Sequence, residues 1–184
     1  MNRLKGLACY LSGPIDFAED MGCGWRDNIT PILEKMNVKV FNPLSHSFDG
    51  AEEIPYKRVE MDKMLKNGDY AGVHKEMKQL VHMDLRSVDI ASFLIVNYDS
   101  TVHMCGTYEE IFKCNTQVKP CLIVHKKPRK ELSSWMYGRF PPEHFFASWE
   151  ELYIYLEDIN SDPHYQFTKA DNKRWLFFDG DHMN

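Results

Sequence analysis

The chain has 184 residues, a length that suits one domain with at most a short appendage. Its apolar share of 43% is enough for a hydrophobic core, and its formal charge of −5 argues against a nucleic-acid-binding surface, which normally shows a basic face. The five cysteines are an odd number without CxxC pairs, which indicates reduced thiols. The first residues carry too few apolar side chains for a signal peptide or a membrane span, so we expect a cytoplasmic protein.

The first half of the chain alternates apolar runs with amphipathic stretches. Its predicted elements are, in chain order, a strand over 6–11, a helix over 24–36, a strand over 38–41, a polar loop over 45–55, and helices over 56–66 and 70–89. Strand, helix and strand joined by short connections are typical of a parallel α/β unit.

The second half continues this alternation. It predicts a strand over 91–97, a helix opened by Gly106 and Thr107, a strand over 118–124, a short strand over 144–147 and a helix over 149–159. These patterns indicate an α/β fold, flavodoxin-like or Rossmann-like, with about five parallel strands and helices on both faces. We expect one α/β domain over 1–159, followed by an aromatic extension over 160–184 that packs on the domain or on a partner chain.

Polar segments follow each predicted strand at its carboxyl end. In doubly wound sheets a ligand binds outside this edge, near the point where the strand order reverses. The segments that we expect to meet there are residues 10–16, 42–46, 98–110 and 126–135. They supply the candidate binding residues Ser12, Gly13, Pro14, Ile15, Asp16, Asn42, Asp99, Gly106, Thr107, Ser133 and Ser134.

Two carboxyl groups and one hydroxyl group stand out as candidate catalytic groups. Glu110 is placed in the first turn of its predicted helix, where the helix dipole favours an ionised carboxylate, and this makes it a candidate nucleophile. Asp84 shares the apolar stripe of its helix with Leu80 and Val88, so it is either a functional carboxyl or part of a structural pair. The hydroxyl group of Tyr10 would need a partner if it is buried, and a bond to a nucleophilic carboxylate would hold that carboxylate in one rotamer.

Other common chemistries lack their sequence patterns. The histidines at positions 74, 82 and 103 have no third donor at ligand spacing, so no metal site is expected. There is no Walker pattern, no GxGxxG and no GxSxG motif. We therefore expect chemistry carried by carboxyl groups.

Three ordered blocks of sequence resemble the nucleoside 2-deoxyribosyltransferase family. The opening Tyr-x-x-Gly-Pro pattern matches Tyr10-Leu11-Ser12-Gly13-Pro14, the Asp-Leu block matches Asp84-Leu85 with Asp89 following, and Gly-Thr-x-x-Glu matches Gly106-Thr107-Tyr108-Glu109-Glu110. The order and spacing of the blocks agree with the family, and the resemblance covers roughly residues 6–158.

The resemblance implies a flavodoxin-like fold, a homo-oligomer of two or more chains, and no metal or cofactor. It implies that Glu110 attacks C1′ of a 2′-deoxynucleoside, that Tyr10 orients Glu110, and that Asp84 contacts Glu110 or the sugar and serves proton transfer. It also implies that a residue after the fourth strand, with Ser133, Ser134 and Glu131 as candidates, reaches the 5′ end of a substrate bound by a neighbouring subunit. The expected partners are a deoxynucleoside or deoxynucleotide and a nucleobase, without nucleic acid or membrane.

Two alternatives to transfer between nucleobases remain open. The first is a hydrolase that splits 2′-deoxynucleoside 5′-monophosphates, because the Ser133 and Ser134 hydroxyls with the nearby basic residues of the segment 126–129 would suit a phosphate. The second is a nucleotide-binding or sensing module without catalysis, which would use the same edge of the sheet.

Overall fold

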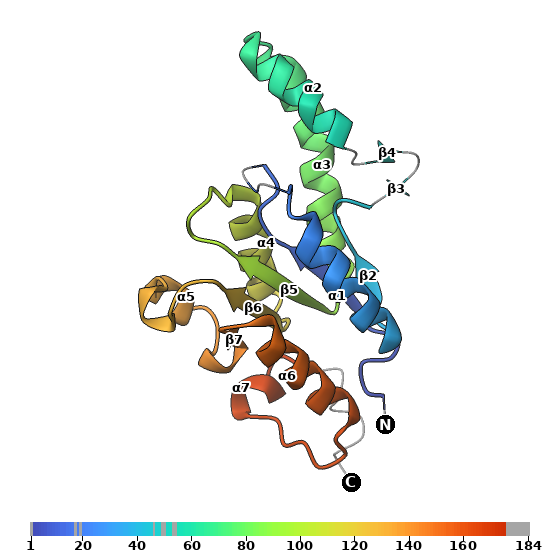
Figure 1. Cartoon of the computed structure of the whole chain (residues 1–184), viewed down its shortest axis with the longest axis vertical. Helices are drawn as coiled ribbons and strands as arrows, with labels where there is room; N and C mark the ends of the chain where they lie inside the picture. Colours follow the sequence, from blue (N-terminus) through green and yellow to red (C-terminus); the bar gives the residue numbers. More distant parts are fainter. Residues whose placement is uncertain are drawn as a thin grey trace.

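The computed structural model describes residues 2–16, 18, 20–45, 47–48, 51–52 and 55–175. Five parallel strands form its main sheet in the spatial order β2-β1-β5-β6-β7 (Figure 1). The strands are β1 (Ala8–Ser12), β2 (Lys39–Phe41), β5 (Phe93–Tyr98), β6 (Cys121–His125) and β7 (Phe145–Phe146). Numbered along the chain, these strands follow the 2-1-3-4-5 order of flavodoxin-like sheets. The predicted fold class is confirmed.

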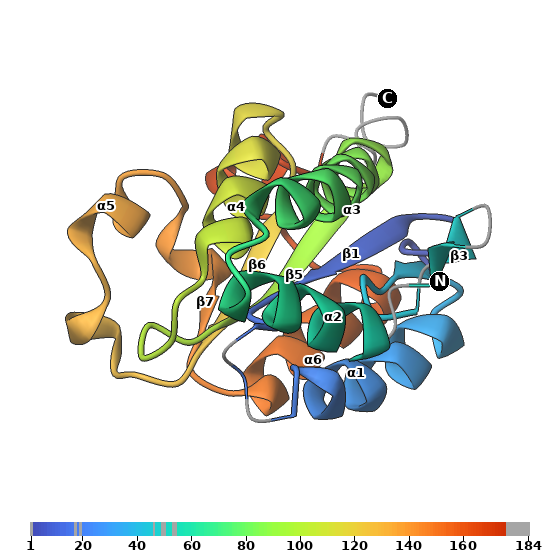
Figure 2. The same cartoon turned by 90° about the horizontal axis from the view of Figure 1, so that it is seen from above.

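Two helices cover one face of this sheet. Helix α1 (Cys23–Lys35) and helix α6 (Trp149–Ser161) lie on the same side in the view of Figure 2. Ile29 and Leu33 of α1 are fully buried, because their spacing of four residues keeps both on the inward side of the helix. They join the side chains of Leu152 and Leu156 of α6 in one hydrophobic cluster with the sheet.

Two other helices cover the opposite face. Helix α3 (Tyr70–Ile90) and helix α4 (Cys105–Thr116) contact each other and strand β1. Their buried side chains, such as Val88 of α3 and Ile111 of α4, belong to a second hydrophobic cluster that also contains Tyr10. The parallel strands are buried on both faces, which explains why they are continuous apolar runs in the sequence.

Helix α3 extends beyond the sheet and is accompanied there by helix α2 (Pro55–Lys66) (Figure 1). Helix α3 begins after Asp69, whose side chain accepts a hydrogen bond from the Gly72 N–H as an N-cap. The predicted polar loop over 45–55 contains a short antiparallel pair, β3 (Ser47–Phe48) with β4 (Ala51–Glu52). The α2–α3 pair thus projects from the carboxyl edge of the sheet.

The segment after α6 packs back on the sheet as far as it is described. Helix α7 (Lys169–Asn172) places Asp171 beside His144, with 2.9 Å between the carboxylate oxygen and Nε2 of the buried imidazole. Trp175 is buried against Phe93, with 5.2 Å between the ring centroids. The aromatic side chains at positions 177 and 178 lie outside the described residues.

Short helical turns complete the described chain. They are the 3-10 turns η1 (Arg129–Glu131) and η2 (Pro142–His144) and helix α5 (Ser134–Tyr137). All five cysteines are free thiols, and Cys105 is the exposed one among them. No helix in the described ranges combines the length and the apolar character needed to cross a bilayer.

Candidate active site

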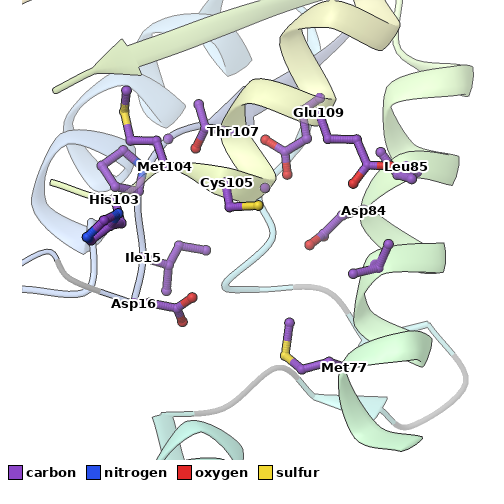
Figure 3. Close-up of a pocket in the computed structure, with 15 residues that line it drawn as sticks. Ile15, Asp16, Met77, Asp84, Leu85, His103, Met104, Cys105, Thr107 and Glu109 are labelled. Atoms are coloured by element: carbon purple, nitrogen blue, oxygen red, sulfur yellow. The ribbon is translucent and has the colours of Figure 1, made fainter. Parts of the chain in front are cut away.

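A pocket of about 260 Å³ opens at the carboxyl end of strand β1, between the loop after β1, helix α3 and the start of helix α4 (Figure 3). All three sequence blocks singled out above contribute residues to its wall. Its lining residues are Gly13, Pro14, Ile15, Asp16, Met77, Val81, Asp84, Leu85, His103, Met104, Cys105, Gly106, Thr107, Glu109 and Glu110. Residues 84 and 110, far apart in the sequence, therefore share one cavity.

Glu110 is the buried carboxyl group of this pocket, and two hydroxyl groups hold it. The Tyr10 hydroxyl donates a hydrogen bond of 2.9 Å to Oε1, and the Ser12 hydroxyl donates one to Oε2. Tyr10 and Ser12 are both fully buried in strand β1. They are two positions apart, and in a strand such side chains point to the same face. One strand thus fixes both oxygens of the carboxylate.

Burial raises the pKa of Glu110 from its ordinary value of 4.5 to about 7. The nearby Asp84 adds to this rise, because two negative charges in one pocket repel each other. The hydrogen bonds from Ser12 and Tyr10 and the charge of Arg26 act in the opposite direction and stabilise the ionised form. Near neutral pH the pocket therefore contains both forms of this carboxyl group.

The predicted position of Glu110 in the first helical turn is wrong. Helix α4 begins at Cys105, with Met104 as its N-cap, so the first turn carries no acidic residue and Glu110 lies in the second. The helix dipole acts mainly within the first turn. The charge state of Glu110 is therefore set by burial, by Asp84 and by its hydrogen-bond donors, and its pKa is raised where we had expected a carboxylate held ionised.

Asp84 lines the same pocket from helix α3 and is partly buried. The predicted apolar stripe of this helix is correct at Leu80 and Val88, which are buried, and wrong at Val81, of which 38% is exposed. Val81 and Asp84 face the pocket together, because this part of α3 lies at the edge of the sheet. Arg86, two positions further along α3, is exposed.

Arg26 is a buried residue of this region that the sequence analysis did not select. Its guanidinium group donates to three backbone carbonyls, those of Leu11 at 3.3 Å, Gly13 at 3.0 Å and Gly22 at 2.8 Å. The group also lies 4.5 Å from the ring centroid of Trp25. Arg26 therefore holds the loop that forms one wall of the pocket. A charged residue three positions before Ile29, on the buried side of a predicted helix, was the signal that could have revealed it.

Several predicted binding residues lie in the pocket and others lie elsewhere. Gly13, Pro14, Ile15, Asp16, Gly106 and Thr107 are in its wall, while Tyr10 and Ser12 act through Glu110. Asn42, Asp99, Ser133 and Ser134 are not among its described lining residues. His46, in one of the segments expected at this edge, lies outside the described residues.

Asp99 has a structural environment. Its carboxylate accepts hydrogen bonds from the backbone and hydroxyl of Thr101 and forms an ion pair of 2.6 Å with Lys126. Partial burial opposes ionisation of Asp99, but Lys126 and Thr101 outweigh it and lower the pKa to about 2. The Asn42 side chain likewise accepts from the Leu44 N–H and closes the turn after β2.

Ser133 caps helix α5, and Ser134 is the first residue of that helix. Both are exposed, neither is among the described residues that line the pocket, and α5 stands apart from α3 (Figure 2). Their contact with a substrate in a neighbouring subunit stays a prediction.

The Tyr10→Phe variant is expected to lower kcat/KM by roughly 10- to 100-fold, the range for losing a hydrogen bond to a charged group. Without the Tyr10 hydroxyl the ionised form of Glu110 loses a donor, so the pKa of Glu110 rises further. The ascending limb of the pH profile of kcat/KM, which we expect near pH 7 in the wild type, should therefore move to higher pH.

Tyr98→Phe is the matched control for this variant. Tyr98 is also buried, but its hydroxyl contacts Tyr108 at 3.1 Å and not Glu110. A Tyr10→Phe profile that overlays that of Tyr98→Phe would contradict the assigned role.

The site defined by this geometry is a carboxyl pair at the carboxyl edge of a flavodoxin-like sheet. One carboxyl group is buried, fixed by two hydroxyl donors and able to change its protonation near neutral pH. Such a group can act as a nucleophile or as an acid–base group. Among the described residues no cluster of three or more His, Cys, Asp or Glu side chains is arranged to hold a metal ion.

Two solved structures of 2-deoxyribosyltransferases are similar to this chain. The enzyme from the psychrotolerant bacterium Bacillus psychrosaccharolyticus, described as a biocatalyst for nucleoside synthesis, has a TM-score of 0.56 and 13% identity over 89% of this chain and 95% of its own. The enzyme from Leishmania mexicana has a TM-score of 0.51 and 16% identity over 82% of this chain and 97% of its own. At these identities the likeness establishes a shared fold. No family model matches the chain, and neither does any curated protein.

Proposed function

We propose that the protein is an N-deoxyribosyltransferase that moves the 2-deoxyribosyl group of a 2′-deoxynucleoside to another nucleobase. The observation that carries this proposal is the arrangement of Glu110, buried in a pocket, held by Tyr10 and Ser12, and facing the same cavity as Asp84. The shared fold with two 2-deoxyribosyltransferases supports it, as does the resemblance of the three sequence blocks that supply these residues.

In the proposed first step an ionised Glu110 oxygen attacks C1′ of the sugar. The C1′–N bond breaks, its electron pair goes to the departing nitrogen, and a glycosyl ester forms on Glu110. In the second step the nitrogen of another base attacks C1′ from the vacated side and frees Glu110, so the configuration at C1′ is retained. Two easier displacements thus replace a single, more difficult one.

Asp84 and the two hydroxyl groups have separate roles in this scheme. Tyr10 and Ser12 keep the Glu110 carboxylate in one orientation, as their hydrogen bonds indicate. Asp84, on the facing helix, contacts the sugar and takes part in proton transfer. Its negative charge also raises the pKa of Glu110, which makes the ionised carboxylate a stronger nucleophile in the first step.

The charges of the pocket favour an uncharged nucleoside over the 5′-monophosphate of the alternative hydrolase. Four carboxyl groups line the pocket, those of Asp16, Asp84, Glu109 and Glu110. No lysine or arginine is among the lining residues that the structure describes. A phosphate entering this pocket would meet like charges, which is unfavourable at short range.

A product assay separates the proposed function from both alternatives. The protein is incubated with a 2′-deoxynucleoside, or with its 5′-monophosphate, each with and without a second free base, and the products are separated by chromatography. We expect a new nucleoside from the unphosphorylated substrate when the second base is present. Free sugar phosphate from the monophosphate would indicate the hydrolase, and saturable binding without any cleavage would indicate a sensing module.

A further inference from the structure

The loop between β5 and α4 places His103 in the wall of the pocket. His103 is exposed and precedes the first residue of α4 by two positions. Its imidazole lies on the same side of the cavity as Ile15 and Asp16, and Asp84 with Leu85 lies on the opposite side (Figure 3). A molecule that fills the cavity would therefore have the Asp84 carboxyl group on one side and the imidazole on the other.

His103 contributes an imidazole to this cavity, whereas the other titratable groups of its described lining are carboxyl or thiol groups. Those groups are Asp16 from the loop after β1, Asp84 from α3, and Cys105, Glu109 and Glu110 from α4. Carboxyl groups in water have given up their protons at neutral pH, whereas an imidazole carries a transferable proton there. Within the described lining, His103 is also the residue that offers a side-chain N–H.

The proposed reaction needs such a proton donor. A nucleobase leaves as an anion unless one of its nitrogens receives a proton while the C1′–N bond breaks. Glu110 cannot supply that proton, because it must be ionised to attack C1′. The donor must therefore be another group that faces the bound molecule. His103 meets this condition, because it lines the pocket across the cavity from Asp84 and is exposed.

Building on the proposed function, we propose that His103 is the general acid that protonates the departing nucleobase. As Glu110 forms its bond to C1′, the C1′–N bond breaks and the electron pair remains on the base. The imidazolium of His103 gives its proton to a ring nitrogen of that base and becomes neutral. When the second base attacks C1′, the neutral imidazole removes the proton of the attacking ring and is restored.

The test compares two substrates that differ in their need for a proton. 2′-Deoxyguanosine requires protonation of its base, whereas N7-methyl-2′-deoxyguanosine already carries a positive charge on the ring and releases a neutral base. We expect His103→Gln to lower the rate with 2′-deoxyguanosine by roughly 100- to 10,000-fold, the usual contribution of a general acid. With the N7-methyl substrate we expect the same variant to lose less than about 10-fold.

The matched control is His82→Gln. His82 is exposed on α3 and is not among the described residues that line the pocket. If His103→Gln lowers the rate equally with both substrates, or lowers it with neither, the proposal is overturned. Wild-type protein that cleaves neither substrate above the uncatalysed rate would instead count against the proposed function, so the two failures are distinguishable.

Discussion

The Glu110→Gln variant is expected to lose deoxyribosyl transfer by on the order of 10,000-fold or more, because a neutral amide cannot form the glycosyl ester. The side chain keeps its size and can still bond the hydroxyls of Tyr10 and Ser12, so the pocket should stay intact. The measurement is the rate of formation of the new nucleoside at saturating substrate. Glu34→Gln, an exposed position on α1, is the matched control. Near-normal turnover of Glu110→Gln would contradict the role of nucleophile.

The same variant is expected to be more stable than the wild type at high pH. A carboxyl group whose pKa is raised on folding stabilises the folded state only while it is protonated, and the folded state loses stability as the pH rises through the folded value. For Glu110 the rise from 4.5 to about 7 corresponds to roughly 3 kcal/mol at pH well above 7. The difference in free energy of unfolding between variant and wild type should therefore grow from pH 5 to pH 8.5. A difference that stays constant over this range would show that Glu110 is not buried as described.

The second large effect is expected at Arg26. Arg26→Met keeps an unbranched apolar stem but removes the guanidinium donors to the carbonyls of Leu11, Gly13 and Gly22. Buried carbonyls without partners are costly, so the free energy of unfolding should fall by about 3 kcal/mol or more. The rising limb of the pH profile should also move to higher pH, because the charge that favours ionised Glu110 is lost.

Two further variants test the geometry around Arg26. Arg86→Met on the exposed side of α3 should leave stability and activity near wild type. Arg26→Lys keeps the positive charge but lacks the planar guanidinium group that reaches three acceptors. Its pH profile of activity should therefore be closer to wild type than its free energy of unfolding. Urea unfolding and initial rates measure these effects. A change below about 1 kcal/mol for Arg26→Met would contradict the structural role.

Strands β1, β5 and β6 were predictable because each is a short apolar run that is almost entirely buried. The run over 91–97 became β5 with a shift of one or two residues, and the short run over 144–147 became the two-residue strand β7. The hairpin of β3 and β4 could not be predicted, since its pairs of two residues leave no alternation long enough to detect.

The helix boundaries at the site were harder to predict, because they depend on contacts from distant parts of the chain. Gly106 and Thr107 suggested that α4 begins there, but the helix includes Cys105. Glu110 receives its hydrogen bonds from residues about one hundred positions earlier. Periodicity within one helix carries no information about such partners. The rule that ligands bind at the carboxyl edge of the sheet predicted the position of Glu110. Its proximity to Asp84 was predicted only by the resemblance to the nucleoside 2-deoxyribosyltransferase family.

The environment of Asp99 follows from strand register, which the sequence does not specify. Strands β5 and β6 pair with Tyr98 opposite His125, so the next residues, Asp99 and Lys126, emerge side by side and form an ion pair. If the register were known, the Asp99 carboxylate would be expected to pair with Lys126. Without the register, nothing in the sequence distinguished Asp99 from the other acidic residues predicted at the edge of the sheet.

The projection of α3 beyond the sheet divides the pocket into parts with different tolerance to change. Glu110, Tyr10 and Ser12 stand on elements packed in the centre of the molecule, whereas Met77 and Val81 stand on the helix that only α2 accompanies beyond the sheet. Substitutions at these two apolar positions can reshape the cavity without disturbing the charge network. On the proposed function, we expect substitutions at Met77 and Val81 to change the range of accepted bases while the chemical step stays the same.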